Sequence, residues 1–323
     1  MEKRFLELDA LRGFAALAVA VFHYTNRAAH AGHPLFPFAF GAHGVQLFFC
    51  ISGFVIYWTL ERSRTLTDFA VSRFSRLYPT YWCALVLLIL LDALSGVRPW
   101  WGGYARDAAM VQTFLGWPDV DIVYWTLGIE LAFYVWMAAV FATRSMHRMV
   151  MVAMIWLAIC IVCGLTHVTS LAPWLIYEHA PYFLAGVMFY RIRCEGWRWP
   201  YGLVIIAAGL AVCVISQTPL LVSVVFGIFA LAISGKLGWI VNRATVWLGT
   251  VSYSLYLTHR AFGGWILGRL LNADVPGYLA LMLALSAAIA LASLVTVVIE
   301  RPALRAIRAL YRPHYAKIQM TTG

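Results

Sequence analysis

Hydrophobic residues in this chain are gathered into long, nearly uninterrupted runs. A helix needs roughly 20 residues to span the hydrocarbon core of a bilayer, and ten runs near that length can be placed at 8–26, 43–62, 76–95, 123–143, 149–167, 174–191, 200–216, 219–236, 247–270 and 277–300. The pattern predicts an all-α fold, a polytopic membrane helix bundle of about ten transmembrane helices. We expect one domain over residues 1–323, with a short basic cytoplasmic tail at 301–323.

The composition excludes an ordinary soluble domain. Hydrophobic residues make up 63% of the chain and charged residues 12%, and the mean hydropathy is +0.79. The net charge of +10 is explained by topology. With the N-terminus inside, eighteen of the twenty-four basic residues fall on the inner side, and the exceptions are Arg27, Arg98, Arg106 and Arg269 outside and Arg12 and Arg260 within spans. The positive-inside rule therefore predicts cytoplasmic N- and C-termini. We expect membrane lipids as the surroundings and no nucleic-acid partner.

The outer connection at 96–122 is rich in aromatic residues. It holds Trp100, Trp101, Tyr104 and Trp117. Such residues are typical of an anchor at the membrane interface. The alternative is a platform of flat rings that binds an acceptor molecule.

Ionisable residues within spans are candidate functional residues, because they are costly in hydrocarbon unless they are paired or hydrated. In the first run, Arg12 and His23 are eleven positions apart and share one helix face, with Asp9 one turn before Arg12. Ala16 and Ala20 lie between them and leave space beside this face. The alternative is that Arg12 snorkels to the inner headgroups and His23 caps the outer end.

Two further runs hold charged candidates. Arg73 and Arg76 are three apart at the inner start of the third run, and paired guanidinium groups suit phosphate binding. Taken alone, the pair is better explained by topogenic anchoring of a helix end. Glu130, in the segment that begins at Trp125, lies inside the fourth run and needs a basic partner or a proton.

The last two runs add polar residues. Ser252, Tyr256 and His259 share a face of the ninth run, as hydrogen-bonding residues of a purely structural helix also do. Pro302 is expected to end the last helix, with Glu300 beside it pairing with a basic neighbour. The remaining histidines show no metal-ligand spacing, so no metal site is expected. No H-E-x-x-H, G-x-S-x-G or Walker pattern occurs in the sequence.

Six motifs in order give the chain a resemblance to the acyltransferase family 3 membrane proteins. The family's Arg-x10-His pattern falls on Arg12 and His23, and its Gly-Val-x-x-Phe-Phe-x-x-Ser-Gly-Phe segment on 44–54, which includes Ser52. Its Arg-x-x-Arg loop falls on Arg73 and Arg76, and its W-[ST]-L-x-x-E segment on Trp125 to Glu130. Its S-Y-S-L-Y-L-x-H segment falls on 252–259 and its E-x-P on Glu300 to Pro302. The chain ends soon after the tenth run, so no fused extracellular domain of the kind found in larger members is expected.

The resemblance implies an activity. Family members transfer an acyl group, commonly acetyl, from cytoplasmic acyl-coenzyme A to a hydroxyl of a glycan or small molecule. We therefore expect acetyl-coenzyme A as co-substrate, no permanently bound cofactor, and a glycan or lipid-linked glycan acceptor from exopolysaccharide or lipopolysaccharide O-antigen. The expected location is the bacterial cytoplasmic (inner) membrane, with polysaccharide-assembly proteins as further partners.

The resemblance also suggests roles for the residues. Arg73 and Arg76 hold the coenzyme A phosphates, and the pantetheine arm enters beside the two alanines. His23 serves as general base or as transient acyl carrier, two routes that the sequence does not separate. Glu130 orients His23 or stabilises its cation, and Arg12 steadies the donor or pairs with Asp9. Supporting roles fall to Asp9, Ser52, Trp125, Tyr256, His259 and Glu300.

Three other functions are left open by the sequence. The first alternative is an acyltransferase whose acceptor is a macrolide or another secreted metabolite. In the second the chain is a proton-coupled transporter or flippase that transfers no acyl group, because intramembrane Arg, His and Glu also mark such pathways. The third is a non-catalytic scaffold.

Overall fold

The computed structural model describes residues 5–33, 35–166 and 172–321, and these ranges contain helices and turns but no strand. The long helices are α1 (Leu6–His30), α2 (Gly44–Arg62), α3 (Leu66–Leu94), α5 (Trp125–Ala142), α6 (Met149–Thr166), α8 (Ala180–Glu195), α9 (Trp199–Ser216), α10 (Pro219–Ile233), α11 (Arg243–Thr258), α12 (Gly264–Asn272), α13 (Gly277–Val295) and α14 (Arg301–Thr321). Each of the ten predicted runs overlaps at least one of them. Residue 167, the end of the fifth run, lies outside the described residues.

Short elements connect the long helices. Two are α-helical, α4 (Trp101–Asp107) and α7 (Ala172–Leu175), and five are 3₁₀ turns, η1 (Ala39–His43), η2 (Gln112–Leu115), η3 (Ile122–Tyr124), η4 (Met146–Arg148) and η5 (Gly238–Ile240). Two π-helical turns, η6 (His259–Gly263) and η7 (Thr296–Glu300), join α11 to α12 and α13 to α14. Such turns are rare and often lie at functional sites.

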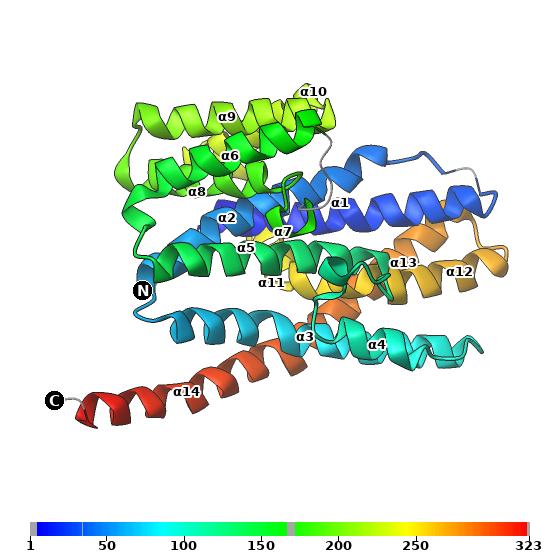
Figure 1. The fold of residues 1–323 in the computed structure, drawn as a ribbon. Helices are drawn as coiled ribbons and strands as arrows, with labels where there is room; N and C mark the ends of the chain where they lie inside the picture. Colours follow the sequence, from blue (N-terminus) through cyan, green and yellow to red (C-terminus); the bar gives the residue numbers. More distant parts are fainter. Residues whose placement is uncertain (1–4, 34, 167–171, 322–323) are drawn as a thin grey trace.

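The prediction of a helical membrane protein is confirmed by the length and composition of the helices. Among the described residues, six helical segments are long and apolar enough to cross a bilayer, and these are Ala39–Arg62, Leu66–Leu94, Ile122–Ala142, Met146–Thr166, Trp199–Ser216 and Gly277–Tyr311. A shorter apolar helix covers Pro219–Ile233. The figure of about ten spans stays a prediction. The two ends of the described chain lie at the same end of the bundle (Figure 1).

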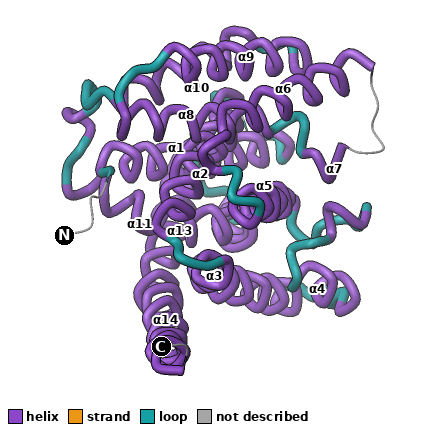
Figure 2. The backbone as a smooth tube through the Cα atoms, turned by 60° about the vertical axis from the view of Figure 1, so that its left-hand side comes forward, coloured by secondary structure: helices purple, strands orange, loops and turns teal. Residues whose placement is uncertain are grey.

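The helices form two groups. Helices α6, α9 and α10 lie together on one side of the bundle in both views (Figures 1 and 2). Helix α8 packs against α9 and, on its other side, against α2. Helix α1 packs along α11, which also contacts α13, and α14 projects from the bundle after contacting α3.

Glycines allow the closest of these helix contacts. A Cβ atom on Gly53 of α2 would lie 2.0 Å from the carbonyl oxygen of Phe183, and one on Gly186 of α8 would lie 2.0 Å from that of Cys50. Gly249 of α11 meets the carbonyl oxygen of Asp9 in the same way, at 1.9 Å. Small residues let backbones approach closely where lipid provides no hydrophobic drive for association.

Two predicted helix ends are wrong. Helix α3 begins at Leu66, ten residues before the third run, because Thr65 and Asp68 form a capping box; Arg73 and Arg76 therefore lie inside the helix. Pro302 does not end the last helix, since α14 continues to Thr321. It is the second residue of α14, directly after the π-turn, and proline is tolerated in a first helical turn. The expected short tail is thus mostly helix.

Candidate active site

A cavity of about 200 Å³ lies among α1, α2, α3, α5, α11 and α14. Four arginines, which are Arg12, Arg73, Arg76 and Arg308, line it together with Glu130. Phe48, Phe49 and Leu127 supply apolar walls. The cavity combines a strongly cationic lining with apolar surface, as a site for an anionic ligand with an uncharged arm requires.

Glu130 is held by hydroxyl groups. Its Oε1 accepts hydrogen bonds from Ser52 Oγ at 2.6 Å and from Tyr134 OH at 2.5 Å. All three residues line the cavity. Glu130 was expected to orient His23, but its hydrogen-bond partners in the structure are these two hydroxyls. Tyr134 was missed by the sequence analysis, although its spacing of four residues from Glu130 on a helix is the available signal.

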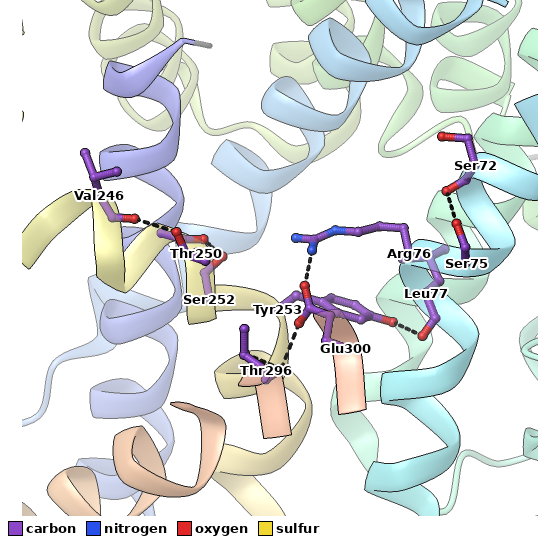
Figure 3. Close-up of polar contacts among 12 residues, drawn as sticks. Ser72, Ser75, Arg76, Leu77, Val246, Thr250, Ser252, Tyr253, Thr296 and Glu300 are labelled. Atoms are coloured by element: carbon purple, nitrogen blue, oxygen red, sulfur yellow. Dashed lines mark hydrogen bonds and ion pairs between the residues drawn. The ribbon is translucent and has the colours of Figure 1, made fainter. Parts of the chain in front are cut away.

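Arg76 forms an ion pair with Glu300 (Figure 3). The other carboxylate oxygen of Glu300 accepts a hydrogen bond from Ser254 Oγ at 3.0 Å, and Thr296 Oγ1 lies 2.9 Å from that hydroxyl. Tyr253 OH donates to the Leu77 carbonyl at 2.9 Å. These contacts join α3, α11 and η7, so Arg76 has a structural partner as well as a place in the cavity wall.

Arg73 lies one helical turn before Arg76. Its Nη2 donates to Ser72 Oγ at 3.1 Å and lies 3.4 Å from Thr59 Oγ1. Its Nε is buried and has no hydrogen-bond partner among the described residues. Unlike Arg76, Arg73 forms no ion pair with a carboxylate in the described part of the chain, so its charge is available to a ligand.

His23 lies outside the cavity lining, towards the opposite end of α1 from Arg12. At the cavity wall, the Tyr256 hydroxyl is 2.9 Å from Thr126 Oγ1. The Tyr256 ring lies 5.9 Å from that of His259, and the His259 ring lies 5.2 Å from that of His23. Two rings, those of Tyr256 and His259, thus connect the cavity wall to His23. Ala16 and Ala20 are fully buried, so the expected space beside them is filled by neighbouring helices.

Trp125 and His179 form an aromatic contact next to the cavity. Their rings are 5.1 Å apart, and Phe49, which lines the cavity, lies 5.1 Å from His179. His179 did not emerge from the sequence, because it is a single histidine before a helix. Its imidazole contacts Phe49, so a second imidazole lies directly behind a residue of the cavity wall.

A polar cluster lies beyond His23, at the end of the bundle where α4 and α12 lie. Arg260 Nη1 forms an ion pair of 3.0 Å with Asp121 Oδ1. Burial raises the pKa of Asp107 to about 6. Burial also raises the pKa of Asp119 and of Asp121, although Arg260 partly opposes the shift at Asp121. Burial therefore disfavours ionisation of the carboxyl groups at this end of the bundle, and the ion pair with Arg260 offsets part of that effect at Asp121.

Comparison with known proteins assigns the family. The model of the acyltransferase 3 family, described as an acyltransferase domain, matches residues 5–301. The chain belongs to this family. Acyltransferase MdmB of Streptomyces mycarofaciens is 26% identical over 94% of this chain and 92% of its own length. Exopolysaccharide production protein ExoZ of Rhizobium meliloti (strain 1021) is 27% identical over 74% of this chain and 80% of its own.

A third relative is matched in part. Peptidoglycan O-acetyltransferase OatA of Listeria monocytogenes is 27% identical over 41% of this chain and 23% of its own length. No solved structure matches the chain. The family match and the apolar helices together make the protein a membrane acyltransferase. The predicted enzyme class is confirmed.

Proposed function

We propose that this membrane acyltransferase moves an acyl group, acetyl in the simplest case, from cytoplasmic acyl-coenzyme A to a hydroxyl of an exported glycan. The observation that carries the proposal is the cavity with its four arginines, among them Arg73, whose buried Nε has no hydrogen-bond partner in the described structure. Coenzyme A is an anion with several phosphate oxygens and a long uncharged arm. It matches a lining of guanidinium groups and aromatic side chains.

The donor is bound as follows. Arg73 binds a phosphate with its free donor, while Arg308 and Arg12 add positive charge around the anion. The uncharged arm lies against Phe48, Phe49 and Leu127, and the thioester points to the wall formed by Thr126 and Tyr256. Arg76 contributes its charge while it holds α3 to η7 through Glu300.

The transfer requires a base for the acceptor hydroxyl. His23 takes the proton, the hydroxyl oxygen attacks the thioester carbonyl, and the carbon–sulfur bond breaks to release coenzyme A thiolate, which is then protonated. In the other route, His23 first accepts the acyl group and then passes it to the hydroxyl. In either route Tyr256 and His259 lie between the donor cavity and His23, so the acyl group must pass this pair of rings.

The membrane arrangement follows from the donor. Because acyl-coenzyme A is cytoplasmic, the arginine-lined end of the bundle faces the cytoplasm and both termini lie on that side, which about ten spans allow. The membrane is the bacterial cytoplasmic membrane. The acceptor, a sugar of an exopolysaccharide or lipopolysaccharide precursor, approaches from the His23 side, and polysaccharide-assembly proteins supply it. The similarity to ExoZ and OatA, whose names refer to exopolysaccharide and peptidoglycan, supports a glycan acceptor.

The test is transfer of labelled acetyl from acetyl-coenzyme A by membranes that contain the protein. We expect label in extracted glycan with wild type and none with His23→Ala. His30→Ala is the matched control, because His30 lies on the same helix, is exposed and bonds only its own helix, at Asn26. Label in a small-molecule fraction would assign the other acceptor class. Equal transfer by wild type and inserted His23→Ala would contradict the mechanism.

A further inference from the structure

His259 has a fixed proton position. Its Nδ1 lies 2.7 Å from the carbonyl oxygen of Tyr256 and 3.2 Å from that of Leu255. A carbonyl oxygen only accepts hydrogen bonds, so Nδ1 carries the hydrogen. The ring is fully buried beside Arg260, which favours the neutral form. In that form Nε2 is an acceptor with a lone pair.

The lone pair of His259 has no partner within its own helix. Nε2 is buried and forms no hydrogen bond to any described residue. Unpaired buried polar atoms are uncommon and call for an explanation. The nearby imidazole of His23, with its ring centroid at 5.2 Å, supplies one.

The structure holds the two rings in place. The Tyr24 hydroxyl donates a hydrogen bond of 2.9 Å to the His259 carbonyl. A Cβ atom at Gly263 would lie 1.7 Å from that hydroxyl, so only glycine leaves room for it. Because Tyr24 directly follows His23 on α1, the π-turn η6 is attached to α1 beside His23. The separation of the two imidazoles is therefore set by the backbone contacts of α1 and η6.

We propose that His259 is a positioning residue for His23, through a hydrogen bond from one ring nitrogen of His23 to His259 Nε2. Hydrogen bonds between nitrogen and its acceptor span about 2.9 Å, and ring nitrogens project outward from the centroids, so a centroid separation of 5.2 Å suits two imidazoles that share one proton. Such bonds are often long in a protein without substrate and shorten during reaction.

The hydrogen bond decides which nitrogen of His23 reacts. With one nitrogen donating to His259, the other is unprotonated and is the atom available as base or nucleophile. This inference rests on the proposed role of His23 in acyl transfer. It explains why a buried histidine stands at the first residue of a π-turn between the cavity wall and His23.

Two substitutions separate this role from a structural one. His259→Asn retains a donor at the place of Nδ1, and with it the bond to the Tyr256 carbonyl, but has no atom at the place of Nε2. His259→Gln reaches the place of Nε2 with an oxygen acceptor. If His259 acts through His23, the rate of acyl transfer by His259→Asn falls about tenfold or more, because a correctly placed general base contributes a larger rate factor than that. His259→Gln stays within about threefold of wild type by the same reasoning.

A second readout does not depend on turnover. Diethyl pyrocarbonate modifies unprotonated imidazole nitrogen, and mass spectrometry of the full-length protein in detergent measures its rate at His23. We expect His259→Asn to slow this rate about twofold or more, because His23 is then divided between its two neutral tautomers. We expect His259→Gln to preserve the rate. The amount of inserted protein and its unfolding transition are compared in all variants.

The outcomes are distinct. Wild-type values for His259→Asn in both assays would overturn the proposal. Loss of activity in His259→Gln with activity kept in His259→Asn would also overturn it, because that pattern is expected if His259 has only a structural role. If wild type itself transfers nothing from acetyl-coenzyme A, the proposed function fails. The chemical modification rates then still decide whether His259 positions His23.

Discussion

The ion pair between Arg76 and Glu300 should be a strong contribution to the stability of this fold. Its partners lie 224 positions apart and join α3 to η7. The Glu300 side chain is 4% exposed and that of Arg76 is 26% exposed. Removing one partner of a fully buried pair costs about 3–5 kcal/mol. Because Arg76 is partly solvated, we expect Glu300→Gln to lower the free energy of unfolding by about 2–3 kcal/mol.

A double-mutant cycle isolates this interaction. Unfolding in mixed micelles, followed by circular dichroism, is compared for Arg76→Gln, Glu300→Gln and the double variant, with an expected coupling of about 2 kcal/mol. Arg73→Gln with Glu300→Gln is the matched control, since Arg73 lies on the same helix and is hydrogen-bonded to Ser72 and Thr59. These two changes should add to within about 0.5 kcal/mol. Additivity of the Arg76 and Glu300 changes as well would refute the reasoning.

Three further predictions concern packing, the outer loop and donor binding. Gly186→Ala should destabilise the protein by about 1–3 kcal/mol, because its Cβ would press on the Cys50 carbonyl, whereas Gly227→Ala, with open space around it, should be neutral or stabilising by up to about 1 kcal/mol; equal melting temperatures would contradict this. The raised pKa of Asp107, about 6, means that the folded state holds the proton more tightly than the unfolded chain. The stability it provides is present below pH 4 and is lost as the pH rises through 6, so Asp107→Asn should match wild type at pH 4 and exceed it at pH 8 by about 1–3 kcal/mol in thermal unfolding. If the difference in stability between Asp107→Asn and wild type did not change with pH, the raised pKa of Asp107 would be excluded as its cause. Arg73→Gln should raise KM for acetyl-coenzyme A about tenfold with kcat little changed, as expected for loss of one charged hydrogen bond; steady-state kinetics with an unchanged KM would remove Arg73 from the donor site.

The helices were largely predictable from the sequence. Membrane-spanning runs are marked by hydrophobic length alone, and each predicted run overlaps a helix in the structure. The early start of α3 was also within reach, because Thr65 and Asp68 form a recognisable capping pair. The continuation of the helix past Pro302 could not be predicted. It depends on a π-turn directly before α14, which accommodates the proline in the helix.

The arrangement of the site was predictable only in part. Charged residues in apolar runs identified Arg12, Arg73, Arg76 and Glu130, which the structure brings to one cavity. Their partners were not predictable, because the contacts of Glu130 with Ser52 and of Arg76 with Glu300 join distant segments. The placement of His23 behind His259 likewise results from the packing of α1 against α11 and η6.

The most direct test of the account is the sidedness of donor use. Labelled acetyl-coenzyme A is supplied outside sealed vesicles, either inverted or right-side-out, that contain wild-type protein or His23→Ala. We expect acceptor-dependent transfer of label and release of free thiol in inverted vesicles with wild type only. Transfer in right-side-out vesicles alone, or equal transfer by His23→Ala, would contradict the claim that acyl groups enter from the arginine-lined cytoplasmic end and react at His23.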